Sequence, residues 1–362
     1  MKILVINCGS SSIKYKLFEF PKKTLIGKGL IEKIGEESSV IQTHAEGIKV
    51  LFERLISSKT VKDINEISVI GHRVVHGGET FKVPILINER VIDKIRECSS
   101  LAPLHNPANL AGILGCKEMF PKIKQIAVFD TAYHQTIAEP VYLYPIPIEY
   151  YRKHGVRKYG FHGTSHQFVA ERAAHILKKP LSKLKIITCH LGNGCSITAI
   201  NKGKVVDTSM GFTPLEGLMM GTRSGDIDTA AVFYIMEKEN LSITQMDEIL
   251  NRKSGLLGVS NISNDIRVLK EKAIDGNKLA KLALGMFMYR IKKYIGAYYI
   301  ILGGADVVCF TAGIGENNPD MIAEFKKDIC KISKNKTKVM VVPTEEELMI
   351  ATLSYDLLNE NR

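Results

Sequence analysis

A strand–glycine turn–strand unit occurs twice in the chain and restricts its possible folds more than any other pattern. The first copy, ILVINCGSSSIKYKLFEF, combines an apolar strand, a Gly-Ser turn and a strand of alternating apolar and polar residues. The second copy, IITCHLGNGCSITAINKGKVV, turns at Gly192, Asn193 and Gly194. Alternation with a period of two is typical of half-buried strands, and glycine turns join antiparallel neighbours. The recurrence predicts two related halves, each opening with a β-hairpin.

Helical patterns lie between and after these units. They are clearest after Thr164, after Ile227, after Thr244, along residues 278–301, and from Glu345 onward. A third glycine turn is expected after the apolar strand in VVCFTAGIGENN. Strands that alternate with helices predict a mixed α/β architecture. The proline-containing segment 129–147 is the best candidate for a crossing between two domains.

Length and charge narrow the function classes. A chain of 362 residues can form two domains, each with its own core. The net charge of +11 is spread along the chain, which suits anionic ligands. No basic stripe interleaved with aromatic residues is present, so a nucleic-acid partner is not expected. The longest apolar stretch, 282–302, is interrupted by Arg290, Lys292 and Lys293, which predicts a buried or interface helix and not a membrane span.

The cysteines indicate the compartment. Seven of them are scattered through apolar runs without a CxxC pair, which predicts neither a disulfide framework nor a zinc site. The first residues, MKILVINCGSSS, pass from one lysine directly into a strand, unlike a signal peptide. We therefore expect a cytoplasmic protein.

The first glycine turn can bind an anion. Ser10, Ser12 and Lys14 add two hydroxyls and one cation to the backbone N–H groups of the turn. The segment lacks the GxxxxGK[ST] pattern and is therefore not a Walker loop. An ordinary serine-rich hairpin remains the alternative interpretation.

Two charged side chains follow apolar strands. Arg73, in GHRVVHGGETF, is placed to hold a carboxylate or phosphate through two parallel hydrogen bonds, although a surface pair with Glu79 is equally consistent. Asp130 ends the strand in AVFDTAYHQT, where a carboxylate can serve a metal or act as a general base. Its alternative role is to cap the following turn.

A histidine precedes the helix in YGFHGTSHQF. We expect Thr164 or Ser165 to cap this helix, so that His162 can donate to a phosphoryl oxygen near the helix N-terminus. His166 lies four residues later, but no HExxH glutamate or third ligand is near, so we expect it to pack or hydrogen-bond within the helix.

A second arginine lies between glycines in GLMMGTRSGDID. Arg223 aimed at a transferring phosphoryl group would stabilise the charge of the transition state. An ion pair with Asp226 is the alternative. Near the C-terminus, Thr344 and Glu347 in PTEEELMIA fit a capping box, which leaves Glu345 or Glu346 to face a cation. These residue types combined predict metal-assisted phosphoryl transfer, which depends on charge and position.

A series of segments resembles the acetate kinase family, nearly end to end and in the family's order: NCGSSSIK, GHRVVHGGE, LAPLHNPANL, VFDTAYHQT, YGFHGTSH, HLGNGCSITAI, DTSMGFTPLEGLMMGTRSGDID, SGLLGVS, FTAGIGEN and PTEEELMIA. The resemblance implies an α/β fold of two actin-like ATPase (ribonuclease H-like) domains with a central cleft. It also implies a homodimer and direct in-line transfer between ATP and acetate, with Mg²⁺ or, in its place, Mn²⁺. On this pattern, residues 1–131 and 346–362 form the acyl and phosphate domain, and residues 132–345 form the nucleotide-binding and dimerisation domain.

The resemblance also implies roles for individual residues. Arg73 and Arg223 are similar to the pair that binds the carboxylate and the transferring phosphoryl group, and His162 to the histidine that stabilises this group. Asn7 resembles the residue near the phosphates and metal, and Asp130 and Glu346 the carboxylates that place magnesium. The acyl pocket implied is apolar and consists of Val75, Leu104, Phe161 and Pro214. The implied phosphate and nucleotide residues are Ser10, Ser12, Lys14, His190, Gly192, Asn193, Gly194, Asp265, Arg267, Gly313, Ile314, Gly315 and Glu316.

Some positions depart from the family pattern. Thr229 replaces the usual proline, Asn261 the usual glycine and Glu345 the usual asparagine. The stretches before Ile67 and after FTAGIGEN are shortened. The catalytic positions are retained, so we expect activity. Val75 keeps the acyl pocket small, and one methylene there changes the preference by only about 1–3 kcal/mol. A propionate or butyrate kinase is therefore the alternative, followed by a non-catalytic binder of the same fold.

Overall fold

Both predicted hairpins are present in the computed structural model, which describes residues 1–37, 39–103 and 105–360. Strands β1 (Lys2–Cys8) and β2 (Ile13–Glu19) pair antiparallel, and the N–H of Gly9 donates to the carbonyl of Ser12 across the turn at 2.8 Å. Strands β7 (Lys185–Leu191) and β8 (Cys195–Asn201) form the second hairpin.

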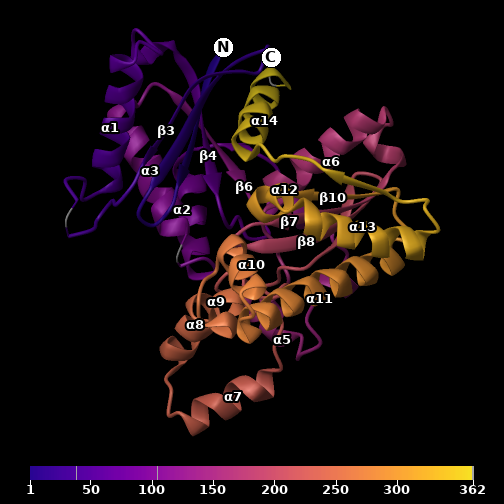
Figure 1. Ribbon diagram of the computed structural model, residues 1–362. Coiled ribbons are helices and arrows are strands. Elements are labelled where there is room, and N and C mark those ends of the chain that lie inside the picture. The colour runs from indigo at the N-terminus through magenta and orange to yellow at the C-terminus, as the bar shows by residue number, and fades with distance from the viewer. Residues whose placement is uncertain (38, 104, 361–362) are drawn as a thin grey trace. The chain divides into compact units, whose positions relative to one another are not determined.

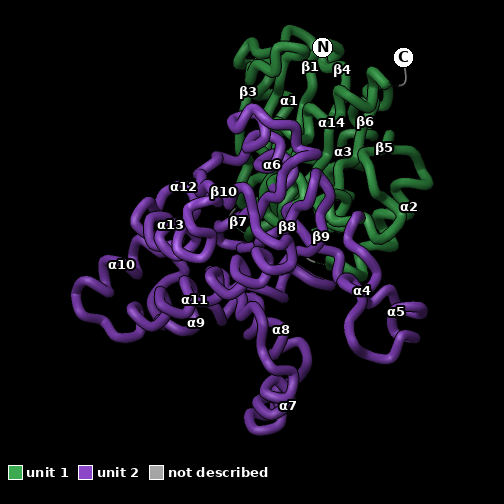
Figure 2. The backbone as a smooth tube through the Cα atoms, turned by 90° about the vertical axis from the view of Figure 1, so that its right-hand side faces the viewer, with its two compact units in different colours: residues 1–135, 163–165, 345–362 green, residues 136–162, 166–344 purple. Residues whose placement is uncertain are grey.

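The chain divides into two compact units (Figure 2). Unit 1 contains residues 1–135, 163–165 and 345–362, and unit 2 contains residues 136–162 and 166–344. The chain therefore leaves unit 1, builds unit 2 and returns to unit 1 through its last helix.

Unit 1 is built on a six-stranded sheet with the order β3-β2-β1-β4-β6-β5 (Figure 1). Its remaining strands are β3 (Thr24–Ile31), β4 (Ile67–Val74), β5 (Ile85–Leu86) and β6 (Lys124–Phe129). Its helices are α1 (His44–Ser57), α2 (Glu89–Glu97), α3 (Asn106–Met119) and α14 (Glu346–Glu360). Alternate residues of a strand face opposite sides of a sheet. Leu4 and Ile6 accordingly pack against α1 and α3, whereas Ile3 and Val5 pack against α14.

Unit 2 is built on a five-stranded sheet with the order β11-β10-β7-β8-β9. Its remaining strands are β9 (Lys204–Thr208), β10 (Val307–Thr311) and β11 (Lys338–Val341). The helices that belong wholly or mainly to it are α4 (Glu139–Tyr142), α5 (Glu149–His154), α6 (Gly163–Leu177), α7 (Thr229–Lys238), α8 (Ile243–Arg252), α9 (Gly255–Ser260), α10 (Ile266–Ile274), α11 (Lys278–Ile301), α12 (Ala312–Asn317) and α13 (Pro319–Ser333).

The two sheets share one plan. In each, three antiparallel strands are followed by two strands that continue parallel to the first: β3-β2-β1-β4-β6 in unit 1 and β9-β8-β7-β10-β11 in unit 2. The prediction of two related α/β halves is confirmed. None of the helices in the described ranges has the length and apolar character needed to cross a membrane.

The third predicted glycine turn is wrong. Strand β10 passes directly into α12, and the change of direction occurs at Ala312, which has a φ of +64°. The carboxylate of Glu316 accepts from the N–H of Ala312 at 2.8 Å and from that of Thr344 at 3.2 Å. A side chain one helical turn later therefore secures a bend that we expected glycine to make.

Candidate active site

In unit 1, Arg73 and Asp130 are brought together by neighbouring parallel strands. Arg73 lies on β4, and Asp130 directly follows β6. The Nε of Arg73 donates to Oδ1 of Asp130 at 3.0 Å, and its Nη2 donates to Oδ2 at 2.6 Å. Arg73 therefore forms neither the predicted alternative pair with Glu79 nor a purely surface contact. Asp130, whose alternative predicted role was to cap the following turn, holds Arg73 through these hydrogen bonds.

Glu346 adds a second carboxylate to this group. Its Oε2 lies 3.9 Å from Nη2 of Arg73. Burial disfavours the charge of Arg73, but Asp130 and Glu346 outweigh this effect, so the pKa of Arg73 is raised. Burial raises the pKa of Asp130, and the charge of Arg73 opposes that rise. Arg73 is thus a permanent cation. Its Nε and Nη2 are held by Asp130, and its Nη1 is available to a ligand.

The prediction of a capping box at Thr344 and Glu347 is wrong. The helix begins at Glu346, and the N–H of Thr344 donates to Glu316. Glu347 is buried and pairs with Lys14 at 2.6 Å and with Lys16 at 3.1 Å. Lys14, predicted to bind phosphate, is therefore already paired with a carboxylate. Ser10 is exposed, Ser12 is half-buried, and Asn7 lies half-buried opposite Lys14 in the hairpin.

Two asparagines that sequence reasoning missed position the segment after Arg73. The side-chain oxygen of Asn109 accepts from the N–H of Val75, and that of Asn106 accepts from the N–H of His76, both at 3.0 Å. Asn109 also donates to the carbonyl of Cys8 at 2.7 Å, which ties α3 to the end of β1. The available signal was the repeated asparagine in HNPANL, because such polar residues recur at helical spacing where an apolar face is expected.

In unit 2, His162 adopts a left-handed conformation (φ +57°) at the N-cap of α6. The expectation of Thr164 or Ser165 at this cap is wrong, because the helix begins two residues before Ser165, at Gly163. Nδ1 of His162 lies 2.8 Å from the hydroxyl of Ser196, and its ring stacks on His190 with centroids 4.1 Å apart. His166 packs as expected, since it is completely buried, and its ring also lies within hydrogen-bond distance of side chains of β7 and β8.

Arg223 lies beside this histidine. A Cβ placed on Gly194 would lie 3.4 Å from Nε2 of His162 and 3.5 Å from Nη1 of Arg223, so both groups border the glycine tip of the second hairpin. Nη1 of Arg223 donates to the carbonyl of Pro214 at 3.1 Å. Burial lowers the pKa of Arg223, and among the described residues no carboxylate pairs with it. The alternative pair with Asp226 does not form; Asp226 accepts from Gly217 and Tyr294.

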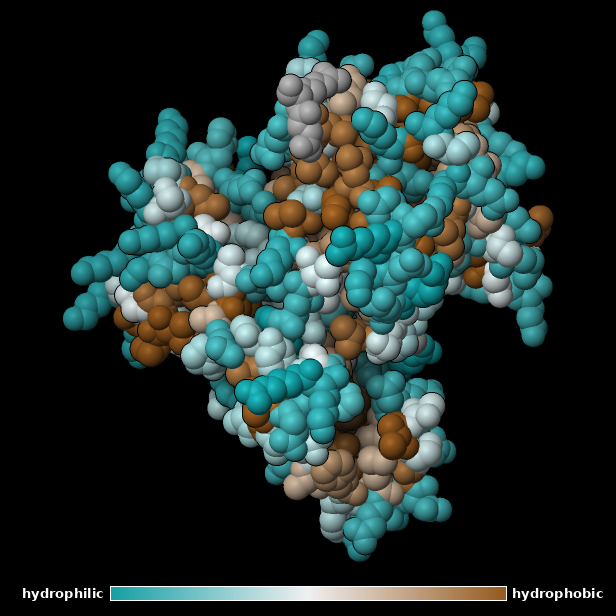
Figure 3. All heavy atoms as spheres, turned by 180° about the vertical axis from the view of Figure 1, so that it is seen from behind, coloured by the Kyte–Doolittle hydropathy of each residue, from teal (hydrophilic) through white to brown (hydrophobic). Residues whose placement is uncertain are grey.

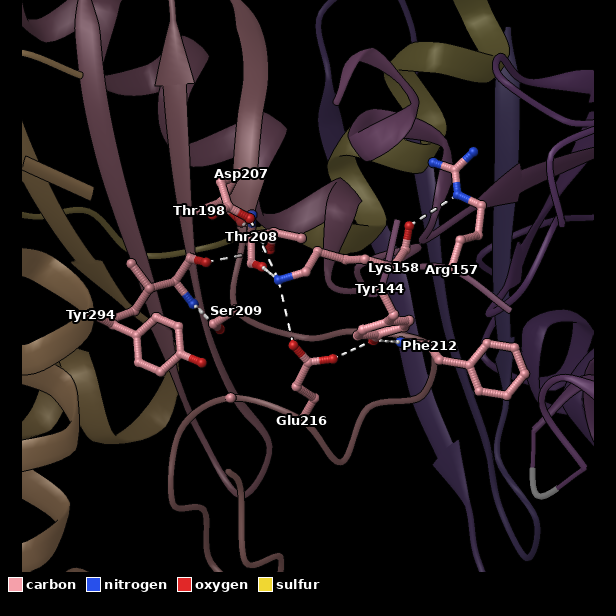
Figure 4. Close-up of polar contacts among 12 residues, drawn as sticks. Tyr144, Arg157, Lys158, Thr198, Asp207, Thr208, Ser209, Phe212, Glu216 and Tyr294 are labelled. Carbon is pink, nitrogen blue, oxygen red and sulfur yellow. Dashed lines mark hydrogen bonds and ion pairs between the residues drawn. The ribbon is translucent and has the colours of Figure 1, made fainter. Parts of the chain in front are cut away.

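A half-buried polar network holds the loop that carries Pro214 (Figure 4). The hydroxyl of Tyr144 donates to Glu216 and accepts from the N–H of Phe212, the latter at 2.8 Å. Lys158 lies 3.5 Å from both Glu216 and Asp207, between the loop and β9. Burial, and then the charge of Glu216, raise the pKa of Tyr144, so it remains a neutral donor. Tyr144 and Lys158 therefore hold the loop at Phe212 and Glu216, on both sides of Pro214 in the sequence.

The predicted nucleotide residues of unit 2 fall into separate groups. The tip of the second hairpin is hydrogen-bonded to the loop that carries Arg223, because the N–H of Gly221 donates to the carbonyl of Asn193 at 3.0 Å. The side chain of Asn193 accepts from Asn264, which directly precedes Asp265. Asp265 caps α10 and holds Arg267 in a surface pair at 2.6 Å. Gly313, Ile314, Gly315 and Glu316 form α12, where Glu316 serves the bend described above.

The predicted acyl-pocket residues are distributed over both units. Val75 belongs to unit 1 and is buried, whereas Phe161 (buried) and Pro214 (half-buried) belong to unit 2. Leu104 lies outside the described residues. Within the described ranges, no group of three or more His, Cys, Asp or Glu side chains is suited to hold a metal ion by itself.

The two sheets of one plan define the actin-like ATPase fold, and the relatives reported below show a phosphotransferase that uses a carboxyl group as acceptor. The fold alone is supported by a ROK family protein from Streptococcus pneumoniae, with 14% identity and a TM-score of 0.50 over 100% of both chains. The model of the acetokinase family matches residues 2–330, and the chain belongs to this family.

Individual relatives are similar to this chain over nearly their whole length. An acetate kinase of Thermoanaerobacterium thermosaccharolyticum is 51% identical, with 97% of each chain covered. The crystal structure of an acetate kinase from Porphyromonas gingivalis has 43% identity and a TM-score of 0.92, with 99% of each chain covered. A propionate kinase from Francisella tularensis has 42% identity and a TM-score of 0.89, with 97% of this chain and 98% of that chain covered.

Proposed function

We propose that the protein transfers the γ-phosphoryl group of ATP to acetate, reversibly, giving acetyl phosphate and ADP. An acetate oxygen attacks the γ-phosphorus in line, and the bond to the β–γ bridging oxygen breaks as ADP leaves. The observation that carries this proposal is Arg223, a half-buried guanidinium without a carboxylate partner among the described residues, beside the Nε2 edge of His162. Unpaired positive charge in a partly dry site is what a transferring phosphoryl group requires.

We assign different roles to the two arginines because their surroundings differ. Arg73 is held through Nε and Nη2 by Asp130, which leaves Nη1 to bind the acetate carboxylate in a fixed orientation. Arg223 has no such anchor, so its charge is available to the phosphoryl oxygens, and His162 adds a hydrogen-bond donor. At the hairpin tip, Asn193 and Gly194 supply backbone N–H groups to the phosphates.

Magnesium fits the donor set of unit 1. Mg²⁺ in kinases is held by one or two carboxylates together with substrate phosphates, and not by a complete protein cage. Asp130 and Glu346 are two such carboxylates, both near Nη2 of Arg73, with the amide of Asn7 as a further candidate. When bound, the ion would neutralise phosphate charge. Mn²⁺ has the same ligand preference.

Acyl-chain preference gives the sharpest test. Hydroxylamine traps acyl phosphates, so initial rates with acetate, propionate and butyrate can be compared directly, with ATP and magnesium present and omitted. We expect the highest kcat/KM with acetate and no product without ATP. Val75→Ala should shift the ratio toward propionate by about tenfold or more, since one methylene is worth about 1–3 kcal/mol. Equal or lower rates with acetate than with propionate would contradict the proposed substrate.

Propionate is the second candidate. The structural similarity to the propionate kinase of Francisella tularensis, with a TM-score of 0.89, favours keeping it in the comparison. The same assay decides between the two substrates, and a Val75→Ala variant that leaves the ratio unchanged would remove Val75 from the acyl pocket.

We also propose that the protein works as a homodimer in the cytoplasm. Apolar side chains gather on the surface of unit 2 over α7 (Figure 3). Exposed apolar side chains of this unit include Phe233 of α7, Ile243 of α8 and Tyr289 of α11. Exposed apolar patches of this kind are typical of subunit interfaces. All seven cysteines are free thiols, as in a reducing compartment. Light scattering after size exclusion tests the dimer, and a mass of one chain at micromolar concentration would contradict it.

A further inference from the structure

Four side chains of unit 2 form a continuous hydrogen-bonded chain that ends at His162. Nδ1 of His162 lies 2.8 Å from Oγ of Ser196, which lies 2.7 Å from Nε2 of His166. Nδ1 of His166 in turn lies 2.7 Å from Oγ1 of Thr188. We call Ser196, His166 and Thr188 the imidazole relay.

The fold explains why these residues meet. His162 is the N-cap of α6 and His166 lies in its first turn, with ring centroids 6.5 Å apart. Thr188 of β7 and Ser196 of β8 lie on adjacent strands of one hairpin (Figure 1). Ser196, His166 and Thr188 are completely buried. In such a dry environment, a hydrogen-bonded network fixes the geometry of its members more firmly than in water.

The distances indicate where the protons lie. An N–H donor usually lies 2.9–3.0 Å from an oxygen, whereas contacts of 2.7–2.8 Å are the usual length for a hydroxyl donor. If Thr188 donates to Nδ1 of His166, then Nε2–H of His166 donates to Ser196, and Ser196 donates to Nδ1 of His162. Two of the three short contacts then have hydroxyl donors. The reverse direction has only one, and its Thr188 hydroxyl would point to the carbonyl of Thr198 at 3.5 Å, the limit of a hydrogen bond.

We infer that the imidazole relay holds His162 through Nδ1 and so keeps its proton on Nε2, the nitrogen that borders Gly194 and Arg223. The inference deepens the proposed function and rests on it for the role of His162. A neutral imidazole with Nε2–H donates to a phosphoryl oxygen without prior protonation, and no proton leaves the ring during transfer. Ser196, His166 and Thr188 are positioning residues, because they act on the phosphoryl group only through His162.

The tautomer can be measured without any substrate. In protein labelled with ¹⁵N-histidine, the two ring nitrogens of His162 have different shifts according to which one carries the proton, and a His162→Gln variant assigns the signal. We expect a protonated Nε2 and a bare, hydrogen-bonded Nδ1 in the wild type. A proton on Nδ1 would overturn the inference, whatever the activity of the enzyme.

Threonine variants test the consequence for catalysis. Thr188→Val removes the relay hydroxyl and keeps the shape, so kcat should fall about 10- to 100-fold, as for other supporting contacts of a functional side chain. KM values for acetate and ATP should stay close to those of the wild type, since the interaction acts in the transition state. Thr188→Ser should restore kcat, which a purely packing role would not predict.

The matched control is Thr198→Val. Thr198 lies on β8 two residues after Ser196, is equally buried, and pairs through its hydroxyl with Thr208 at 2.8 Å, outside the relay. We expect this variant to keep the wild-type kcat and the wild-type ¹⁵N shifts of His162. Equal losses in Thr188→Val and Thr198→Val would overturn the relay. A wild type that shows Nε2–H but makes no acyl phosphate would instead refute the proposed function and leave the relay standing.

Discussion

Arg73 and Arg267 each hold an aspartate through Nε and Nη2, yet removing them should have very different consequences for stability. The pairs share their geometry: the Nη2 to Oδ2 distance is 2.6 Å in both. The side chain of Asp130 is only 1% exposed, whereas that of Asp265, the partner of Arg267, is 34% exposed. The burial of the carboxylate, and not the hydrogen bonds themselves, therefore sets the difference.

Arg73→Ala leaves the carboxylate of Asp130 buried without its cation. Breaking one side of a buried pair costs about 3–5 kcal/mol. At about 2–4 °C per kcal/mol for a domain of this size, the unfolding temperature should fall by about 6–20 °C. Arg267→Ala, the matched control, should unfold at nearly the wild-type temperature, because its pair is solvated.

Differential scanning calorimetry at several pH values adds a signature. Without Arg73, the folded-state pKa of Asp130 lies still further above its unfolded value of about 3.9. The folded state then binds more protons than the unfolded state, so stability decreases as the pH rises through this window. The loss should be larger at pH 8 than at pH 5, and the double variant Arg73→Ala/Asp130→Ala should recover part of it. An Arg73→Ala protein within about 2 °C of the wild type at pH 8 would refute the reasoning.

Three further substitutions test catalysis, the acid dependence of stability and backbone strain, one each. Arg223→Ala should lower kcat by about 10³-fold or more while the calorimetric unfolding temperature stays near that of the wild type; near-normal turnover would remove Arg223 from the mechanism. Burial acts to raise the pKa of Glu347, but Lys14 and Lys16 outweigh this effect and lower the pKa overall. The contribution of Glu347 to stability is therefore present above the unfolded pKa of about 4.3. It is lost as the pH falls through the folded-state pKa. Glu347→Gln should therefore weaken the acid dependence of thermal unfolding, and an unchanged pH profile would contradict the pairing. Gly225→Ala should lower the unfolding temperature, because this residue has a φ of +69° and a Cβ would lie 2.3 Å from a backbone oxygen; an unchanged temperature would contradict this.

Local patterns predicted the framework of this protein well. Both hairpins and the long helix α11 depend on neighbours in the sequence, such as glycine at a turn or an apolar residue at every third or fourth position. The relation between the two halves was also visible, because the same hairpin occurs at the start of each. The bend at Ala312 was missed, since a left-handed alanine is rare and only a carboxylate four residues later secures it.

The site was only partly predictable, because its partners are distant in sequence. His166 was expected to pack or to bond within its helix, and it is buried, but its side-chain partners Thr188 and Ser196 lie 22 and 30 residues away on β7 and β8. Glu347 was expected to cap α14, yet it pairs with lysines of the first hairpin. No spacing rule connects such residues. The pairing of Arg73 with Asp130 was easier to predict, because each lies at the end of an apolar run and the two strands concerned are neighbours in the sheet.

The late return of the chain to unit 1 has a consequence on the ribosome. The apolar side of the first sheet, including Ile3, Val5 and Val128, is covered by Ile350 and Ala351 of α14. At roughly 5–20 residues per second, the segment 136–344 takes about 10–40 s to synthesise. During that interval the apolar face of the nascent first sheet is not covered by α14. All strands of unit 2 have already been synthesised when α14 emerges. This face of unit 1 therefore stays without its helical cover until α14 has been synthesised.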